Sequence, residues 1–228
     1  MVNKKENNMS QARQAYNNGD YEKAHKIWLT QAEKGNPEAQ AWLGSLYANG
    51  DGVDVDDKNA LSWYEKAAEQ GYSMAQANVG AMYFMGQGAD KNVDKAIKWL
   101  SAAAENGDVN GLFNLAVIYT KGEEVDINLE RAAELYQQAA EQGHYPSQSR
   151  LGYMYAHGQG VKKDRIKAYL WLSLAAQHGI GTALNELESI VKSMSAEEKA
   201  MGATLSEQWR NKTGANTMQV AMQPTPSN

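Results

Sequence analysis

Hydrophobic residues in this chain recur with the spacing of amphipathic helices, and the helices themselves recur. Between residues 60 and 68, the apolar positions Ala60, Trp63, Tyr64 and Ala67 follow one another at steps of three and one residues. This spacing predicts an α-helix with a single buried stripe. The pattern returns every 36 residues over residues 36–179, which predicts an array of repeated helical units.

A glycine marks the end of each unit, and an Asp or Asn precedes the helical stripe. The periodic glycines are Gly35, Gly71, Gly107, Gly143 and Gly179. They follow a pair of small residues, which is the usual place for a left-handed residue that ends a helix. The polar residues four positions before the first alanine of the stripe are Asp56, Asn92, Asn128 and Asp164. They predict helix N-caps, so the second half of each unit is one helix, called helix B.

The first half of each unit is predicted to form a helix A that packs closely on helix B. In residues 38–49, Leu43, Leu46 and Tyr47 lie on one face. Gly44 falls inside this helix, where glycine costs about 1 kcal/mol relative to alanine. Glycine returns in this position at residues 80 and 152. We therefore expect helix B to approach helix A closely at this point.

These motifs resemble those of a known repeat family. Residues 39–71 read AQAWLGSLYANGDGVDVDDKNALSWYEKAAEQG, and residues 75–107, 111–143 and 147–179 follow the same pattern with small departures. The pattern is similar to that of Sel-1-like repeat proteins, a branch of the tetratricopeptide-repeat-like superfamily. The resemblance implies an all-α fold, a right-handed superhelical α-solenoid of antiparallel helix pairs with about 12 helices. In the third unit, Glu124 replaces the second loop glycine.

The ends of the chain depart from the repeat, as terminal units of a solenoid do. We expect a flexible N-terminus in residues 1–9, a short N-terminal capping repeat in 10–35, four repeats in 36–179, C-terminal capping helices in 180–213 and a disordered tail in 214–228. Ser195 and Glu198 have the spacing of a capping box, which predicts the start of a last helix.

The composition excludes some functions but does not identify one. The chain has no cysteine, which excludes disulfides and thiolate chemistry and sets it apart from the β-lactam-associated branch of the family, where the resemblance implies a disulfide in each repeat. The net charge of −5 disfavours a nucleic-acid partner. The basic run of Lys162, Lys163, Arg165 and Lys167 is interpreted as a solvated loop and helix face.

The sequence also bears on where the protein acts. No stretch approaches the roughly 20 apolar residues of a membrane span, so we expect no membrane insertion. No export signal is visible behind the N-terminus. We therefore expect a cytoplasmic protein, with a periplasmic or exported one as the alternative in case a signal was removed.

No pattern of catalytic or metal-binding residues is evident, so we expect no enzyme, no metal and no cofactor. The histidines lack the spacing of zinc ligands, and the aspartates between residues 51 and 57 lack the spacing of a calcium loop. His144 and His178 are predicted to lie at helix ends, where a cation complements the helix dipole. A hydrolase acting on a cell-wall or peptide substrate is the weaker alternative, because only His157 and Lys121 are available in the groove.

Variable positions on the inward face of helix A are the candidate binding residues. They are predicted from tetratricopeptide-like geometry, in which A helices line a concave groove: Met74, Phe84, Met85, Phe113, Val117, Lys121, Tyr153 and His157. Phe84 and Phe113 are the only two phenylalanines in the chain. They either form an exposed apolar track for a partner or pack between repeats, and the sequence leaves both interpretations open.

These observations favour a non-catalytic scaffold or adaptor for protein–protein interaction. We expect it to bind a protein or peptide in the concave groove, in bacterial regulation or in the cell envelope. The alternative is an inhibitor or immunity-type protein that binds another protein over the same surface. The oligomeric state is not predicted.

Overall fold

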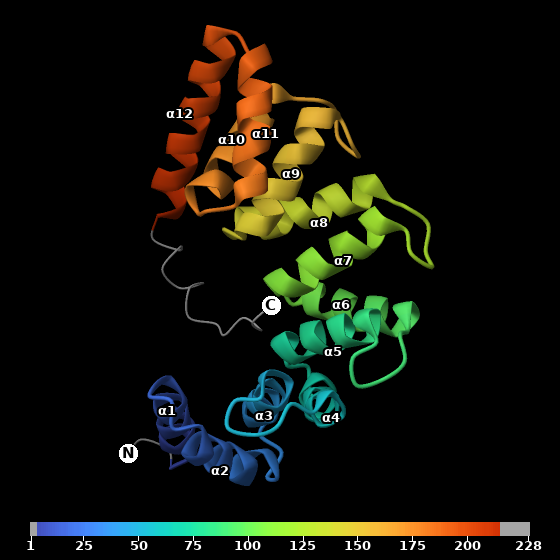
Figure 1. Ribbon diagram of the computed structural model, residues 1–228, viewed down its shortest axis with the longest axis vertical. Helices are drawn as coiled ribbons and strands as arrows, with labels where there is room; N and C mark the ends of the chain where they lie inside the picture. The colour runs from blue at the N-terminus through green and yellow to red at the C-terminus, as the bar shows by residue number, and fades with distance from the viewer. Residues whose placement is uncertain (1–3, 215–228) are drawn as a thin grey trace. The chain divides into compact units, whose positions relative to one another are not determined.

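The computed structural model describes residues 4–214, and within this range the chain forms twelve α-helices and no strand (Figure 1). The helices are α1 (Lys4–Asn17), α2 (Tyr21–Ala32), α3 (Pro37–Asn49), α4 (Asp57–Ala68), α5 (Ser73–Met85), α6 (Val93–Glu105), α7 (Val109–Lys121), α8 (Leu129–Glu141), α9 (Tyr145–His157), α10 (Arg165–Gln177), α11 (Gly181–Ser193) and α12 (Ala196–Thr213). The predicted all-α class and the number of helices are confirmed.

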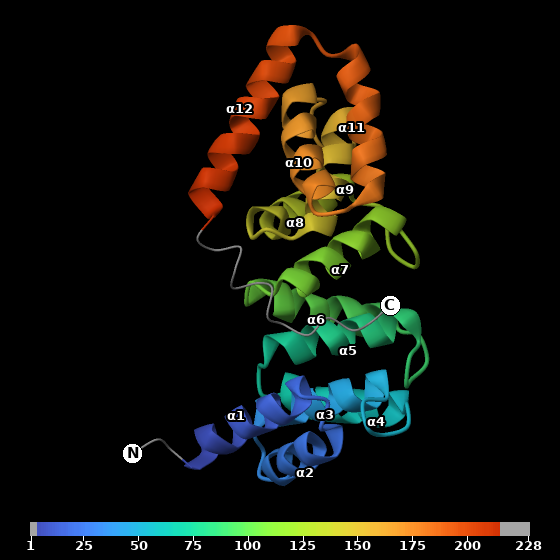
Figure 2. The ribbon, with the colours of Figure 1, turned by 60° about the vertical axis from the view of Figure 1, so that its left-hand side comes forward.

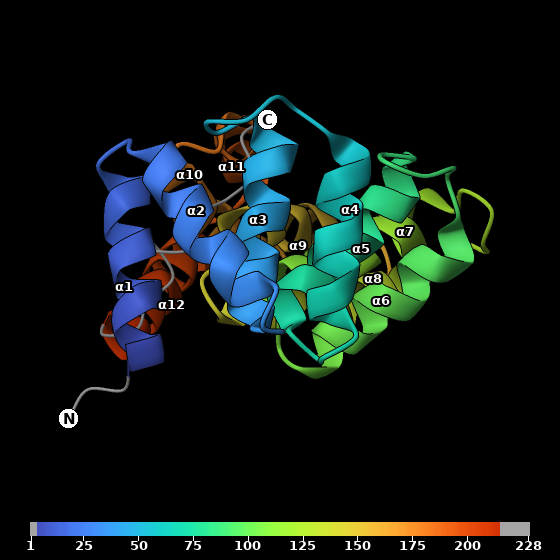
Figure 3. The same ribbon diagram turned by 90° about the horizontal axis from the view of Figure 1, so that it is seen from below.

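The chain divides into two compact units within α7, between Gly111 and Leu112. Unit 1 contains α1 to α6 and the start of α7, and unit 2 contains the rest of α7 and α8 to α12. In unit 1 each helix from α1 to α5 packs on the next one in the chain, and in unit 2 each helix from α8 to α10 does so. Figure 2 shows α5 beside α6 and Figure 3 shows α3 beside α4, each pair running antiparallel. Each unit is therefore built from the antiparallel helix pairs of an α-solenoid.

The B helices (α4, α6, α8 and α10) begin and end as the repeat predicts. The carboxylate of Asp56 accepts a hydrogen bond from the backbone N–H of Asn59 at 2.9 Å, and the same contact recurs in α6, α8 and α10. At the other end of α4, Gly71 has a φ of +83°. Tyr72 then donates its N–H to the carbonyl of Ala67, the bond that closes a left-handed helix stop. The same bond follows all five periodic glycines.

Close contact between the A and B helices explains the glycines inside the A helices. A β-carbon at Gly80 would lie 2.5 Å from Cγ of Leu100 in α6. One at Gly44 would lie 2.7 Å from the Tyr64 ring. Carbon atoms in contact normally stay about 3.5–4 Å apart, so a side chain at these positions would push the two helices apart. The predicted close approach is confirmed.

The N-terminal end differs from its predicted boundaries. Helix α1 begins at Lys4, inside the segment predicted to be flexible. Met9 is buried in a core that also contains Trp28 and Leu43, because it lies on the apolar face of α1. The indole rings of Trp28 and Trp42 stack 4.7 Å apart beside it.

The C-terminal end forms a terminal repeat. Helix α12 begins with the predicted capping box between Ser195 and Glu198. It packs on α10 at an offset of 33 residues, with Ser173 bonded to Ser206 and Gln177 to Arg210. Apart from Gly214, which caps α12, the tail predicted for residues 214–228 lies outside the described residues. Within residues 4–214, none of the helices has the length and apolar character that a membrane span requires.

Candidate functional site

A cleft of about 640 Å³ lies in unit 2 on the side formed by the A helices. It is lined by Phe113 of α7, Pro146, Ser149, Arg150 and Tyr153 of α9, Leu172 of α10, and Ile180, Thr182, Asn185 and Glu186 at and within α11. Two of the candidates predicted from the sequence, Phe113 and Tyr153, therefore meet at one cleft. They reach it from successive A helices because they occupy inward-facing positions of successive repeats.

Phe113 both packs inside unit 2 and forms part of the cleft wall. Its ring centroid lies 5.7 Å from that of Tyr136 in α8 and 5.0 Å from that of His144, the latter in an edge-to-face arrangement. The side chain is only partly buried, so one part of the ring faces the cleft. Phe113 therefore packs against neighbouring helices and is also partly exposed, so each of the two interpretations holds for part of its ring.

His144 occupies a different environment from the one predicted for it. It is the N-cap residue of α9, not a residue at the end of α8, because the preceding Gly143 has already ended that helix. Burial lowers its pKa to about 4, so the imidazole is neutral near pH 7. The predicted role as a cation complementing a helix dipole is therefore wrong for His144. The neutral ring instead supports Phe113 at the edge of the cleft.

Tyr153 is the most exposed aromatic group of the cleft wall, with 41% of its surface accessible. Its ring lies 4.2 Å from that of His157, one turn further along α9. His157 Nε2 lies 2.9 Å from Glu186 Oε1 on α11. This contact joins α9 to α11 beside the cleft.

The cleft offers two kinds of surface to a ligand. Phe113, Pro146, Tyr153 and Ile180 supply apolar and aromatic contact area, whereas Ser149, Thr182 and Asn185 supply hydrogen-bond donors and acceptors. Arg150 and Glu186 add one charge of each sign. An apolar wall with a few polar groups is typical of a site that binds a peptide segment or another compact ligand.

The remaining candidates predicted from the sequence do not line this cleft. Val117 and Lys121 lie further along α7; Val117 is partly buried, and Lys121 Nζ is 3.6 Å from Glu123 Oε1. Met74, Phe84 and Met85 belong to α5 in unit 1. Met85 is 65% exposed, and the Lys91 ammonium lies 5.4 Å from the centre of the Phe84 ring. The residues of the predicted apolar track thus belong to two different units.

The α11 side of the cleft was not identified from the sequence. The helix A pattern weakens after Gly179, so residues 180–213 were interpreted only as a cap. Thr182 and Asn185 nevertheless fall one repeat length after Pro146 and Ser149. Extending the inward-facing positions by one more period would have found both residues.

The described residues contain a serine–histidine contact, but it is not placed for catalysis. Ser147 Oγ lies 2.8 Å from His144 Nδ1, the distance of a nucleophile and its base. Ser147 has no accessible surface, so a substrate does not reach its hydroxyl. Among residues 4–214, no group of three or more His, Asp or Glu side chains is arranged to hold a metal ion.

Comparison with known proteins identifies the repeat. The model of the Sel1 repeat matches residues 37–72, 73–108, 109–144 and 146–180. No protein of curated function matches the sequence. Among solved structures, the chain is similar to a protective antigen of uropathogenic Escherichia coli that displays an SLR fold. The two are 31% identical with a TM-score of 0.79, over 90% of this chain and 45% of that chain.

Two further structures are similar. A Sel1 repeat protein from Oxalobacter formigenes is 37% identical with a TM-score of 0.67, over 74% of this chain and 49% of that chain. A putative Sel1 repeat protein from Klebsiella pneumoniae is 24% identical with a TM-score of 0.56, over 82% and 93% of the two chains. This chain spans about half the length of the Escherichia and Oxalobacter proteins. The four matched segments cover most of the chain and agree with the helix pairs described above.

Proposed function

The chain belongs to the Sel1 repeat family, and on that premise we propose that it is a non-catalytic scaffold that binds a protein or peptide partner in the cleft of unit 2. Proteins with Sel1 repeats generally mediate protein–protein interaction. The observation that carries the proposal is the meeting of Phe113 and Tyr153 at a cleft of about 640 Å³ beside the polar groups of α11.

The chemistry of the cleft favours a partner segment with an apolar side chain. Burial of apolar surface contributes about 25 cal/mol for each Å² removed from water, and the aromatic rings of the wall provide that surface. Ser149 and Asn185 lie where they can bond the backbone of the same segment. The polar contacts fix its orientation, whereas the aromatic contacts supply most of the affinity.

An inhibitor or immunity-type protein would use the same cleft. An inhibitor lowers the activity of its partner on binding, whereas a scaffold does not. Measuring the activity of an identified partner with and without this protein therefore separates the two. The hydrolase alternative lacks support from the cleft, because neither Ser147 nor His144 lines it and Ser147 is buried.

Affinity capture from the native cell, read out by quantitative mass spectrometry, tests the proposal. Wild type is compared with Tyr153→Ala, which removes an exposed ring of the cleft wall. The matched control is Met201→Ala, because Met201 is a similarly exposed apolar residue, 50% accessible, on α12 and is not among the residues that line the cleft.

We expect at least one partner that is retained by wild type and by the Met201 variant and is lost from the Tyr153 variant. Equal recovery of every captured protein from all three would contradict the proposal. Reproducible turnover of a peptide or cell-wall substrate by the purified protein would replace it with the hydrolase alternative.

A further inference from the structure

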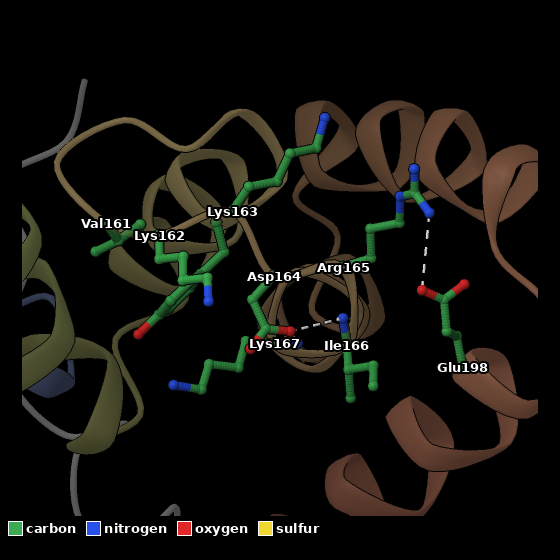
Figure 4. Close-up of a pocket in the computed structure, with 9 residues that line it drawn as sticks. Val161, Lys162, Lys163, Asp164, Arg165, Ile166, Lys167 and Glu198 are labelled. Carbon is green, nitrogen blue, oxygen red and sulfur yellow. Dashed lines mark hydrogen bonds and ion pairs between the residues drawn. The ribbon is translucent and has the colours of Figure 1, made fainter.

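A second concave surface lies in unit 2 at the loop between α9 and α10. It is a pocket of about 730 Å³ lined by residues 161–167 together with Tyr155 and Glu198 (Figure 4). Four of its side chains are cationic: Lys162, Lys163, Arg165 and Lys167. This surface is separate from the cleft of the proposed function, with which it shares no lining residue.

The two carboxylates of the pocket are already engaged. Asp164 caps α10, accepting hydrogen bonds at 3.0 Å from the backbone N–H groups of Ile166 and Lys167. Glu198 of α12 lies 3.7 Å from Arg165. Figure 4 shows this pair on one side of Asp164, and Lys162 and Lys167 on the other. Within residues 4–214, none of the three lysines has a carboxylate partner within 4.0 Å.

At Lys162 the positive charge departs from the repeat and is not required by the fold. Lys162 occupies the loop position that holds Asp54, Asp90 and Asp126 in the other three repeats. Lys163 occupies the position of Val55, Lys91 and Ile127, so a lysine stands there in two of the four repeats. The position of Lys167 is also basic in the second and third repeats, at Lys95 and Arg131. Because the same loop is built three times with an acid at the position of Lys162, that lysine contributes nothing that the loop conformation needs.

An aromatic ring and a close backbone contact hold the basic segment, residues 160–167, against the neighbouring helices. The ammonium of Lys167 lies 5.1 Å from the centre of the Tyr155 ring, a cation–π contact. At Gly160 the loop backbone packs directly on the carbonyl of Leu129 in α8, so closely that no β-carbon fits. Lys162 and Lys163 therefore extend from a loop that packs on α8, and Lys167 extends from the first turn of α10.

We propose that this pocket is a docking surface for an acidic segment of a protein partner, rich in Asp and Glu. A carboxylate-bearing segment supplies the partners that Lys162, Lys163 and Lys167 lack. The acidic character of the whole chain does not prevent this, since charges more than about 10 Å away are largely screened at 0.1 M salt. A nucleic acid, by contrast, needs many phosphate contacts along its length, and the pocket offers only a short cluster.

The test uses a fluorescein-labelled octapeptide of alternating Asp and Glu and the full chain, with binding followed by fluorescence anisotropy. The key variant is Lys162→Asp/Lys163→Val, which converts the loop to the Asp-Val pair present at residues 54–55 and so keeps a sequence the loop already accommodates. The control variant is Lys23→Asp/Lys26→Ala on α2, which changes the net charge equally on exposed residues of unit 1.

We expect wild type to bind the acidic peptide, and the Lys162/Lys163 variant to bind it about tenfold more weakly, because one attraction is lost and one becomes a repulsion. The control variant should stay within about twofold of wild type. Binding should weaken between about 50 mM and 300 mM salt, and an octapeptide of alternating Asn and Gln should not bind.

Several results would overturn the inference. Equal binding of the peptide by wild type and the Lys162/Lys163 variant would do so, as would no binding. Displacement of the peptide by inorganic phosphate at equal concentration would indicate a simple anion site. Preferential binding of a single-stranded oligonucleotide would indicate a nucleic-acid partner. Thermal unfolding of both variants checks the fold, and recovery of a partner that depends on Tyr153 tests the cleft separately.

Discussion

Each A helix contributes both to the interface with its B helix and to the variable inward face, and the two regions constrain its residues differently. At the interface, Gly80 faces Leu100 and Gly44 faces Tyr64 with no space for a β-carbon. At the variable positions predicted for the inward face, one repeat apart, the residues are as different as Ala77 and Phe113. The comparison indicates that shared positions of the repeat maintain the fold and that varied positions are free to serve binding.

The interface is where substitutions should have their largest effect. Leu100 is fully buried, so Leu100→Ala should lower the free energy of unfolding by about 2–5 kcal/mol through loss of burial and a cavity. Gly80→Ala alone should cost about 1–3 kcal/mol by overpacking. The double variant should cost less than the sum, because the new methyl group enters space that Leu100 has left. Chemical denaturation of the four proteins measures this, and strict additivity would contradict the close contact.

His144 is the N-cap residue of α9 and contacts Phe113. Its burial predicts that the stability of the protein depends on pH. Its folded pKa of about 4 is below the usual value near 6.5, so folding disfavours protonation. The resulting stability is fully present above about pH 6.5 and is lost as the pH falls towards 4, by up to about 3 kcal/mol.

Replacing the histidine separates this contribution from other acid effects. His144→Gln should flatten the dependence of unfolding free energy on pH between about 6.5 and 4. His178→Gln, at an exposed residue, is the comparison that corrects for the general effect of replacing a histidine with glutamine. Identical pH profiles for wild type and the His144 variant would show that burial of His144 is not the cause.

Within the cleft, Phe113 and Tyr153 should differ in how much each contributes to stability. Phe113 packs on Tyr136 and His144, so Phe113→Ala should cost about 1–2 kcal/mol of stability, below the range for a fully buried phenylalanine. Tyr153 is 41% exposed, and Tyr153→Ala should cost less than about 1 kcal/mol. Thermal unfolding of both variants measures the difference. A larger loss for Tyr153 would assign that residue to packing and not to a binding surface.

The smallest expected effect on stability comes from changing Glu124 of the third repeat to the glycine that the other repeats have at this loop position. Glu124 has a φ of +62°, in the region that disfavours residues with a β-carbon. Glu124→Gly should therefore raise the free energy of unfolding by up to about 1 kcal/mol. The result is measured by chemical denaturation, with Glu123→Gly as the control that should not stabilise. A loss of stability at Glu124 would show that its side-chain contacts outweigh the backbone strain.

The sequence predicted those parts of the fold that recur. The period fixes the register, so the Asp and Asn caps, the glycine stops and the close contacts at Gly44 and Gly80 could all be assigned before the structure. The structure adds a further recurring contact: Gln40, Gln76 and Gln148 each donate a side-chain hydrogen bond to a carbonyl eight residues earlier.

The site was only partly predictable, because it depends on features that occur once. Phe113 and Tyr153 were found as varied positions, but their meeting with α11 requires knowing that a weakened repeat still folds as a helix pair. His144 was misassigned since its sequence position next to Gly143 suits either the end of one helix or the start of the next. The start of α1 was not predictable from the pattern because residues 4–9 are polar apart from Met9, and the burial of Met9 is a tertiary contact.

The central claim is that the varied surface of unit 2 binds a protein partner while the shared positions maintain the fold. Its most direct test is the affinity of wild type, Tyr153→Ala and Met201→Ala for a captured partner, measured by isothermal titration alongside the unfolding free energy of each protein. The account predicts at least about tenfold weaker binding for Tyr153→Ala, with a stability change below about 1 kcal/mol, and unchanged affinity for Met201→Ala. Equal affinity of all three proteins for the partner would contradict it.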